Sequence, residues 1–268
     1  MMGLKSSQSW TMISHQLRSR WRSLTIWGVA LGALGALYVA LYPSMSKLLE
    51  DYMKEAPESM KGWLGDLQGP ISVEQWMGME FLNMLIPVAL PFLVMLIGMR
   101  AIAGNEERKT LDLFMCNPLP RWRVVAGTVG TMALSLAGVL AITWVLTYLA
   151  VPIAGVDLSP GHLAAALAAL WPLCLLFGTL ALLISALVRR AGLAVAIPAA
   201  ILIAMYVIET LGQMSKTMEP VRVVSLFYHL GTPVEGDFPW TAVLLMLAGV
   251  CVLAGAAVAA FSRRDIYT

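Results

Sequence analysis

The chain has 268 residues, of which 59% are hydrophobic and 13% are charged, and its formal net charge is +2. Soluble domains have roughly 45–50% apolar and about 25% charged residues, so this composition excludes an ordinary soluble protein and predicts a membrane protein. The length would suffice for one large or two small soluble domains, but the apolar runs are too long and continuous for a buried core.

Residues 4–22, near the start of the chain, carry an apolar stripe with helical spacing. Trp10, Ile13, Leu17 and Trp21 follow one another at intervals of three or four residues, with basic residues between them. This pattern predicts an amphipathic helix in the cytoplasmic membrane interface, with tryptophans at headgroup depth. The alternative is a basic flank that only orients the following span.

Six apolar runs, each of about 20 residues or more, are long enough to cross a bilayer as helices. They are residues 24–42, 81–103, 124–151, 163–188, 191–211 and 240–261. A cleaved signal peptide is the alternative for the first run. That run exceeds the roughly 7–15 residues of a signal core, and Tyr42 followed by Pro43 is a poor cleavage context. We therefore expect an N-terminal segment, residues 1–23, and an all-α six-span domain, residues 24–268.

Basic residues are distributed unequally between the two sides that six spans define. One side holds five of the 18 Lys and Arg residues, namely Lys47, Lys54, Lys61, Lys216 and Arg222, and the side shared by both chain ends holds the other 13. Cytoplasmic segments of membrane proteins carry an excess of Lys and Arg. The sequence therefore predicts cytoplasmic termini, a cytoplasmic loop at 104–123, and external loops at 43–80 and 212–239.

The external segment 43–80 is the longest stretch between spans. It mixes apolar residues such as Trp63 and Trp76 with acids and lysines. It is too apolar for a disordered loop and too charged to cross the membrane, so we expect short surface helices over the external mouth. The external loop 212–239 is similar but shorter.

The loop 104–123, GNEERKTLDLFMCNPLPRWR, carries seven charges. Each Arg, Lys or Asp at the centre of a membrane helix costs about 2.5–3.5 kcal/mol, so burying all seven would cost on the order of 20 kcal/mol. The loop must therefore lie outside the hydrocarbon. Its acids Glu106 and Glu107 suit a helix start capped by Asn105, and Pro118 suits a helix end. We expect a short amphipathic helix that docks on a soluble partner or on the membrane surface.

Two stretches of this chain resemble the type-2 ABC exporter permeases, the ABC-2 family. Residues 102–123, IAGNEERKTLDLFMCNPLPRWR, are similar to the family signature between its second and third spans, and residues 261–266, FSRRDI, are similar to its closing motif. The basic stretch at 17–22 and the large external segment match the family layout as well. One departure is Lys109, where family members commonly have glycine.

This resemblance implies the membrane half of an ATP-driven exporter, with the six-span type-2 permease fold and no catalytic or metal site of its own. The residues implied to couple to the ATPase are Glu106, Glu107, Arg108, Lys109, Thr110, Leu111, Leu113, Pro118 and Arg121. The chain has no Gly-Lys dipeptide and hence no phosphate-binding GxxxxGK[ST] loop. ATP and magnesium would therefore be bound by a separate ATPase subunit, present in two copies.

The resemblance further implies a second permease, either an identical copy or a paralogue, in a prokaryotic plasma or inner membrane. No nucleic-acid partner is expected. Pathway-lining candidates are Pro87, Pro91, Pro198 and Glu209, because proline kinks a helix and an acid near the end of a span is either a boundary residue or a substrate contact. Pathway walls rich in Leu, Met, Ala and aromatic residues favour a hydrophobic or amphipathic cargo over an ion.

Two other function classes remain as alternatives. An ATP-independent secondary transporter or channel would place ionisable residues at mid-membrane, where this chain has almost none. An intramembrane hydrolase of the prenyl-protease type would pair two glutamates with an Arg four residues later, but position 111 is Leu. That hydrolase also needs histidines within spans, whereas His15, His162 and His229 lie near interfaces or in loops.

Overall fold

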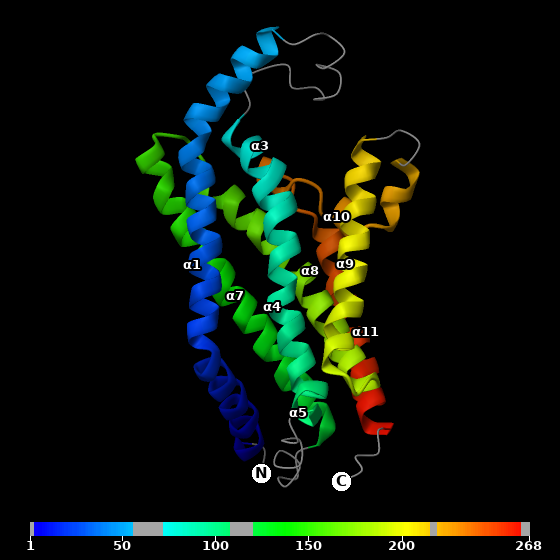
Figure 1. The fold of residues 1–268 in the computed structure, drawn as a ribbon. Coiled ribbons are helices and arrows are strands. Elements are labelled where there is room, and N and C mark those ends of the chain that lie inside the picture. Colours follow the sequence, from blue (N-terminus) through cyan, green and yellow to red (C-terminus); the bar gives the residue numbers. More distant parts are fainter. Residues whose placement is uncertain (1–2, 56–71, 108–119, 215–218, 264–268) are drawn as a thin grey trace.

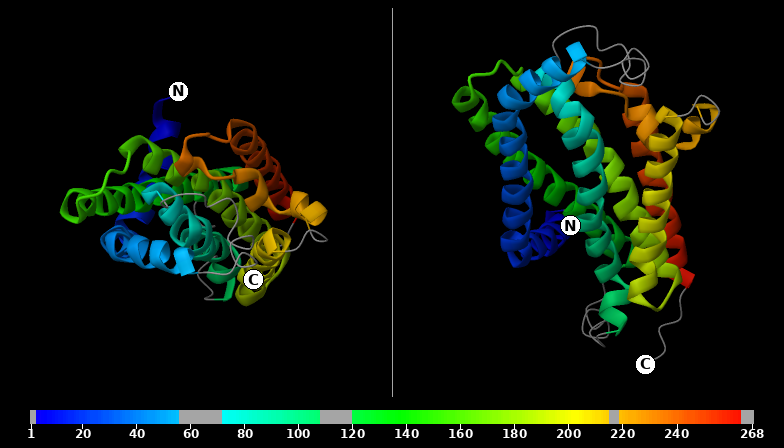
Figure 2. Two further views of the ribbon diagram at one scale, coloured as in Figure 1. Left: turned by 90° about the horizontal axis from the view of Figure 1, so that it is seen from above. Right: turned by 45° about the horizontal axis from the view of Figure 1, so that its top comes forward.

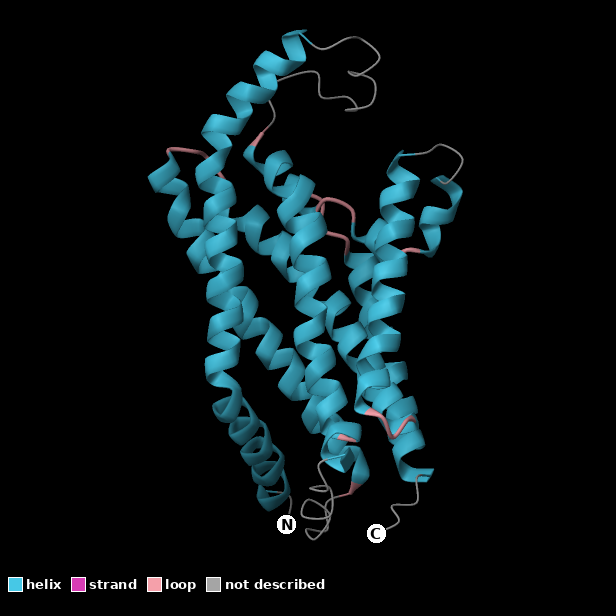
Figure 3. Ribbon diagram, in the orientation of Figure 1, coloured by secondary structure: helices cyan, strands magenta, loops and turns pink. Residues whose placement is uncertain are grey.

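The computed structural model describes residues 3–55, 72–107, 120–214 and 219–263, and within these ranges every regular element is a helix (Figures 1 and 3). Six helical stretches are long and apolar enough to span a membrane. They are Arg20–Leu48, Val73–Ala101, Arg121–Ala154, Pro160–Leu187, Ala191–Gln213 and Trp240–Arg263. The six-span, all-helical expectation is therefore confirmed.

The described elements are all helical. Their bounds are α1 Gly3–Glu55, α3 Val73–Met77, the π-helix η1 Gly78–Leu85, α4 Ile86–Ala101, α5 Ala103–Glu107, α7 Arg121–Ala154, α8 Pro160–Leu187, α9 Ala191–Met214, the 3₁₀ helix η2 Glu219–Val224, α10 Leu226–Leu230, the 3₁₀ helix η3 Pro233–Glu235, and α11 Trp240–Arg263. Local sequence explains several of these ends. Ser72 and Gln75 form a capping box at the start of α3, Ser159 caps α8, and Gly155 ends α7 at a φ of 65°.

The helix α1 differs from the expected first span. It continues through Pro43 to Glu55, so the beginning of the predicted external segment is a helical extension of the span rather than a separate surface helix. Residues 56–71 of that segment lie outside the described residues. The backbone of the predicted interfacial helix is helical from Gly3 onward, as expected. Its placement in the membrane interface remains a prediction.

The core of the bundle is formed by α4 and α8, which pack along each other and are the most buried spans. The helix α11 packs on α8, and α1 packs along α7 (Figure 2). Glycines on α1 allow its close contact with α7. A Cβ atom on Gly28 would lie 2.8 Å from Ile142, and one on Gly32 would lie 2.7 Å from Leu146. The glycines of the first span thus serve helix contact within one chain.

Prolines shape α4 without ending it. The chain is π-helical from Gly78 to Leu85 and becomes α-helical at Ile86, with Pro87 in the first turn of α4. Since Pro87 has no N–H, it cannot donate to the carbonyl four residues earlier, and the wider π-helix immediately before it accommodates this loss. Pro91 lies inside α4 and Pro198 inside α9, and both helices continue past them.

The beginning of α1, the end of α11 and the helix α5 lie at the same end of the bundle (Figure 1). The start of α7 and the turn between α8 and α9 lie there too. These segments and the adjoining end of α4 carry Arg100, Arg121, Arg123, Arg189, Arg190 and Arg263. These described basic residues, which the sequence assigns to one side, therefore lie at one end of the bundle.

Candidate functional sites at the two ends of the bundle

The charged loop begins just after a break in the helix between α4 and α5. Ile102 has φ −124° and ψ −74°, which interrupts the helix between Ala101 and Ala103. The buried hydroxyl of Ser185 on α8 spans the break, since Ser185 Oγ accepts a hydrogen bond from the Ala103 N–H at 2.8 Å and donates to the Met99 carbonyl at 3.0 Å. The break is therefore held in a defined geometry by a neighbouring span.

Replacing Ser185 with Ala is expected to destabilise the folded chain. It would leave a buried N–H without its acceptor, which costs about 1–3 kcal/mol. Thermal unfolding of the purified protein measures this cost. Ser262→Ala is a matched control, because the Ser262 hydroxyl is exposed and bonds only locally to the Ala259 carbonyl. Equal unfolding temperatures for the two variants would contradict the role assigned to Ser185.

The two glutamates of α5 reach the turn between α8 and α9. Glu107 Oε1 accepts a hydrogen bond of 2.7 Å from the N–H of Ala191, the first residue of α9. Helix N-termini have unpaired N–H groups and a positive dipole end, so this carboxylate caps α9 from another segment of the chain. Glu106 Oε1 lies 3.9 Å from Arg189 Nε. We call these contacts, together with Ser185, the α5 junction.

Arg121 joins the two stretches that resemble the family motifs. It begins α7, and its Nη1 donates hydrogen bonds to the carbonyls of Phe261 at 2.6 Å and Ser262 at 2.7 Å. Its guanidinium also lies 5.4 Å from the centre of the Phe261 ring. A cation at the carbonyl end of α11 complements the helix dipole. The loop motif and the tail motif, far apart in sequence, therefore meet at the α5 end of the bundle.

The remaining predicted coupling residues lie outside the described residues: Arg108, Lys109, Thr110, Leu111, Leu113 and Pro118. Their coupling role and the amphipathic helix proposed for them stay predictions. Asn105 does not cap a helix start as predicted. It lies inside α5, and its side-chain amide donates to the Ala101 carbonyl at 3.3 Å, because the helix already begins at Ala103.

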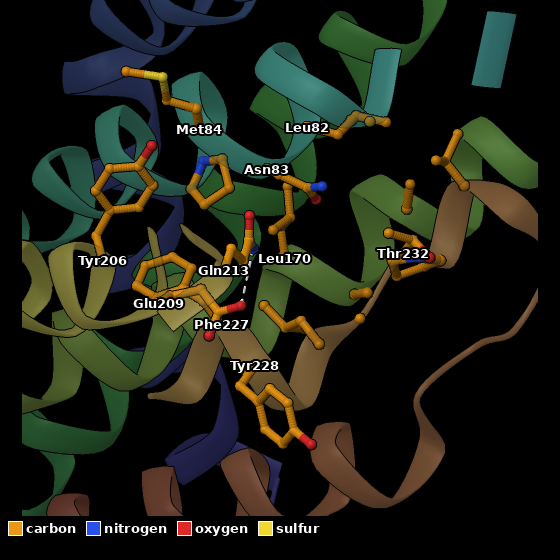
Figure 4. A pocket seen from close by; sticks show the side chains of 18 of the residues that line it. Leu82, Asn83, Met84, Leu170, Tyr206, Glu209, Gln213, Phe227, Tyr228 and Thr232 are labelled. Carbon is orange, nitrogen blue, oxygen red and sulfur yellow. Dashed lines mark hydrogen bonds between the residues drawn. The ribbon is translucent and has the colours of Figure 1, made fainter. Parts of the chain in front are cut away.

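The opposite end of the bundle contains a cavity of about 510 Å³, which we call the distal pocket (Figure 4). Its walls come from α3, η1 and the start of α4, from α8, from α9, and from the roof formed by η2, α10 and η3. Of the four pathway-lining candidates, Pro87 and Glu209 line this pocket. Pro91 and Pro198 do not, because they lie deeper in α4 and nearer the start of α9.

Glu209 is buried in the wall of the distal pocket, with 7% of its surface exposed. Its Oε1 accepts hydrogen bonds from Arg222 Nη2 at 2.6 Å and from Gln213 Nε2 at 3.0 Å, the latter drawn in Figure 4. Its Oε2 is buried and has no hydrogen-bond partner among the described residues. Glu209 is thus held by an ion pair inside the chain, and its role as a boundary residue or a substrate contact stays a prediction.

The ion pair between Glu209 and Arg222 also connects the roof of the pocket to α9. Arg222 belongs to η2, and its guanidinium lies 5.0 Å from the centre of the Tyr228 ring on α10. Ser225 Oγ donates to the Met205 carbonyl at 3.0 Å, and Phe227 meets Tyr206 edge to face at 5.9 Å between ring centres. The loop predicted to be external, 212–239, is therefore, in its described part, a packed cover over the pocket.

Sequence reasoning did not identify Ser185, Arg189 or Arg222 as site residues. Arg222 was notable only as one of the five basic residues on the side predicted to be external, which is a weak indication of a partner for Glu209. Nothing in the sequence distinguishes Ser185 from other hydroxyl residues in apolar spans. No group of three or more His, Cys, Asp or Glu side chains in the described part of the chain is arranged to hold a metal ion.

A family model matches most of the chain. Residues 12–262 match the family model described as "Multidrug efflux system permease Rv1217c, C-terminal domain". No curated protein matches the chain. The matched residues include nearly the whole of the six spans, the α5 junction and the distal pocket. The chain therefore belongs to the family of the C-terminal domain of the multidrug efflux system permease Rv1217c.

Proposed function

We propose that the chain is the membrane permease subunit of an ATP-driven, ABC-2 type exporter, with the α5 end of the bundle in the cytosol. The observation that carries this proposal is the α5 junction. The charged loop that resembles a coupling segment begins at α5, and α5 is bonded directly to two other spans, α8 and α9. The permease family supports a role in transport, and the basic residues at this end support its cytosolic orientation.

In this proposal, the contacts of Glu107 and Glu209 transmit a displacement of the loop along α9 to the translocation pathway. Glu107 holds the first residue of α9, and Glu209 lies near the other end of the same helix. The 24 residues of α9 span about 36 Å at 1.5 Å per residue. A shift of α5 on binding or hydrolysis of ATP by a partner subunit would displace α9 and, through the Glu209–Arg222 pair, the roof of the distal pocket.

The ATPase is a separate subunit in this proposal, and it supplies the bound ATP and magnesium. The permease chain itself provides the pathway, together with a second permease copy, either identical or a paralogue. Cargo is hydrophobic or amphipathic, because the spans carry few charges and the family description names multidrug efflux.

The test is the ATP dependence of transport. The full chain, co-expressed with its ATPase subunit and reconstituted in vesicles, is expected to export an amphipathic dye only when ATP and magnesium are supplied. A variant of the ATPase subunit that binds ATP without hydrolysing it is the control, and it should abolish steady export. Sustained transport by the permease chain alone would overturn the proposal and favour a secondary transporter or channel.

A further inference from the structure

The distal pocket has the dimensions of a binding site for a small organic molecule. Its volume of about 510 Å³ lies within the roughly 300–1,000 Å³ typical of ligand pockets. It is lined by parts of the chain far apart in sequence, so its shape depends on the packed bundle and its roof.

The charged groups in the described wall of the pocket cancel each other. Among the described residues that line it, Glu209 and Arg222 are the only two with charged side chains, and they form an ion pair of 2.6 Å. Arg222 is further engaged with the Tyr228 ring at 5.0 Å. A charged ligand would lose hydration on entry and would meet no unpaired opposite charge in the described wall, so its binding would be disfavoured.

The rest of the wall is both apolar and able to form hydrogen bonds. Leu82, Met84 and Leu170 contribute apolar surface, and Tyr206 and Phe227 contribute aromatic rings (Figure 4). The side-chain amide of Asn83 offers both donors and an acceptor. Such a wall suits an aromatic molecule that carries uncharged polar groups.

We propose that the distal pocket binds uncharged amphipathic aromatic molecules and discriminates against organic cations and anions of the same size. Its role as a substrate site rests on the proposed exporter function, but binding itself needs no ATPase. In the exporter, this pocket would hold cargo at the end of the pathway opposite the α5 junction, beneath the roof that Glu209 and Arg222 fasten.

The experiment measures binding to the purified full chain in lipid nanodiscs without any ATPase subunit. The probes are N-phenylnaphthylamine, its sulfonate and its trimethylammonium derivative, with binding to empty nanodiscs subtracted. The neutral probe is expected to bind saturably and at least about tenfold more tightly than either charged probe, a difference of about 1.4 kcal/mol. Equal or tighter binding of a charged probe would overturn the proposal.

Two variants test whether the neutral probe binds in the distal pocket. Thr210 lines the cavity and bonds only to the Tyr206 carbonyl of its own helix, so Thr210→Phe fills the cavity without leaving a buried partner unpaired. We expect the neutral probe to bind at least about tenfold more weakly. The adjacent Leu211 is exposed and does not line the pocket, so Leu211→Phe should leave binding unchanged. Unchanged binding in Thr210→Phe would place the site elsewhere.

A charge variant tests the reason for the selectivity. Arg222→Gln leaves the Glu209 carboxylate without its counter-ion, so the preference should shift toward the trimethylammonium probe. Glu209→Gln removes the negative charge beside Arg222, so the preference should shift toward the sulfonate. Folded variants with unchanged selectivity would refute the neutral-pair argument. Because no ATPase is present, failure here leaves the exporter function standing, and loss of ATP-driven transport leaves these binding results standing.

Discussion

Replacing Leu111 with Asp is expected to abolish transport-linked ATP hydrolysis while membrane insertion and folding remain intact. The charged loop is predicted to lie outside the hydrocarbon, so an added carboxylate should have little effect on the spans, whereas a docking helix with an apolar face would lose its contact. The measurement is co-purification of the ATPase subunit together with cargo-stimulated ATP hydrolysis. If both persist at the unmodified level, the loop is not the coupling element.

Charge reversal at Glu106 separates contact with the partner from contact within the chain. Glu106→Lys should lower coupled ATP hydrolysis. Because Glu106 also lies beside Arg189, this loss could come either from a broken contact with the ATPase or from a broken contact within the chain. The double variant Glu106→Lys with Arg189→Glu restores an opposite-charge pair at this position. Recovery of hydrolysis in the double variant would assign Glu106 to the α5 junction, and continued loss would assign it to the ATPase contact.

Replacing Gly98 with Leu is expected to prevent formation of the folded bundle. A Cβ atom at Gly98 would lie 2.6 Å from the Gly178 carbonyl oxygen and 2.9 Å from the Leu182 nitrogen. Both are backbone atoms of α8, which cannot move aside as a flexible side chain could, so the central contact between α4 and α8 must open. The yield of monodisperse protein after detergent extraction measures the effect.

The matched control is Gly255→Leu on α11. A Cβ atom at Gly255 meets nothing within 4 Å, so the same change of residue adds no clash there. We expect normal yield and an unchanged unfolding temperature for this variant. Normal yield from Gly98→Leu as well would show that α4 and α8 do not approach as closely as the structure describes.

The spans could be predicted from sequence because the bilayer acts on every residue of a span in the same way. A run of about 20 apolar residues satisfies its own backbone hydrogen bonds as a helix, whatever surrounds it. All six predicted runs fall on spanning helices. Their ends were less predictable, since Pro43 is tolerated inside α1 and the helix continues past it.

The candidate sites were predictable only where the chain is locally unusual. The segment 104–123 stood out through its charges and prolines, and Glu209 stood out as an acid within an apolar run. Their partners did not stand out. Glu107 caps α9 through the backbone N–H of Ala191, and any residue except proline offers that group. Residue type therefore carries no information about this contact.

The sequence by itself determined that this protein has six membrane spans, on which side of them most basic residues lie, and where the charged loop begins. These properties depend on the composition of contiguous segments, and hydration and the bilayer act on such segments independently. Only the tertiary structure decided that Glu107 holds α9, that Arg121 joins the two motif stretches, and that Arg222 neutralises Glu209. Each of these contacts depends on how spans far apart in sequence pack together, because hydrogen bonds and ion pairs need atoms within a few ångströms.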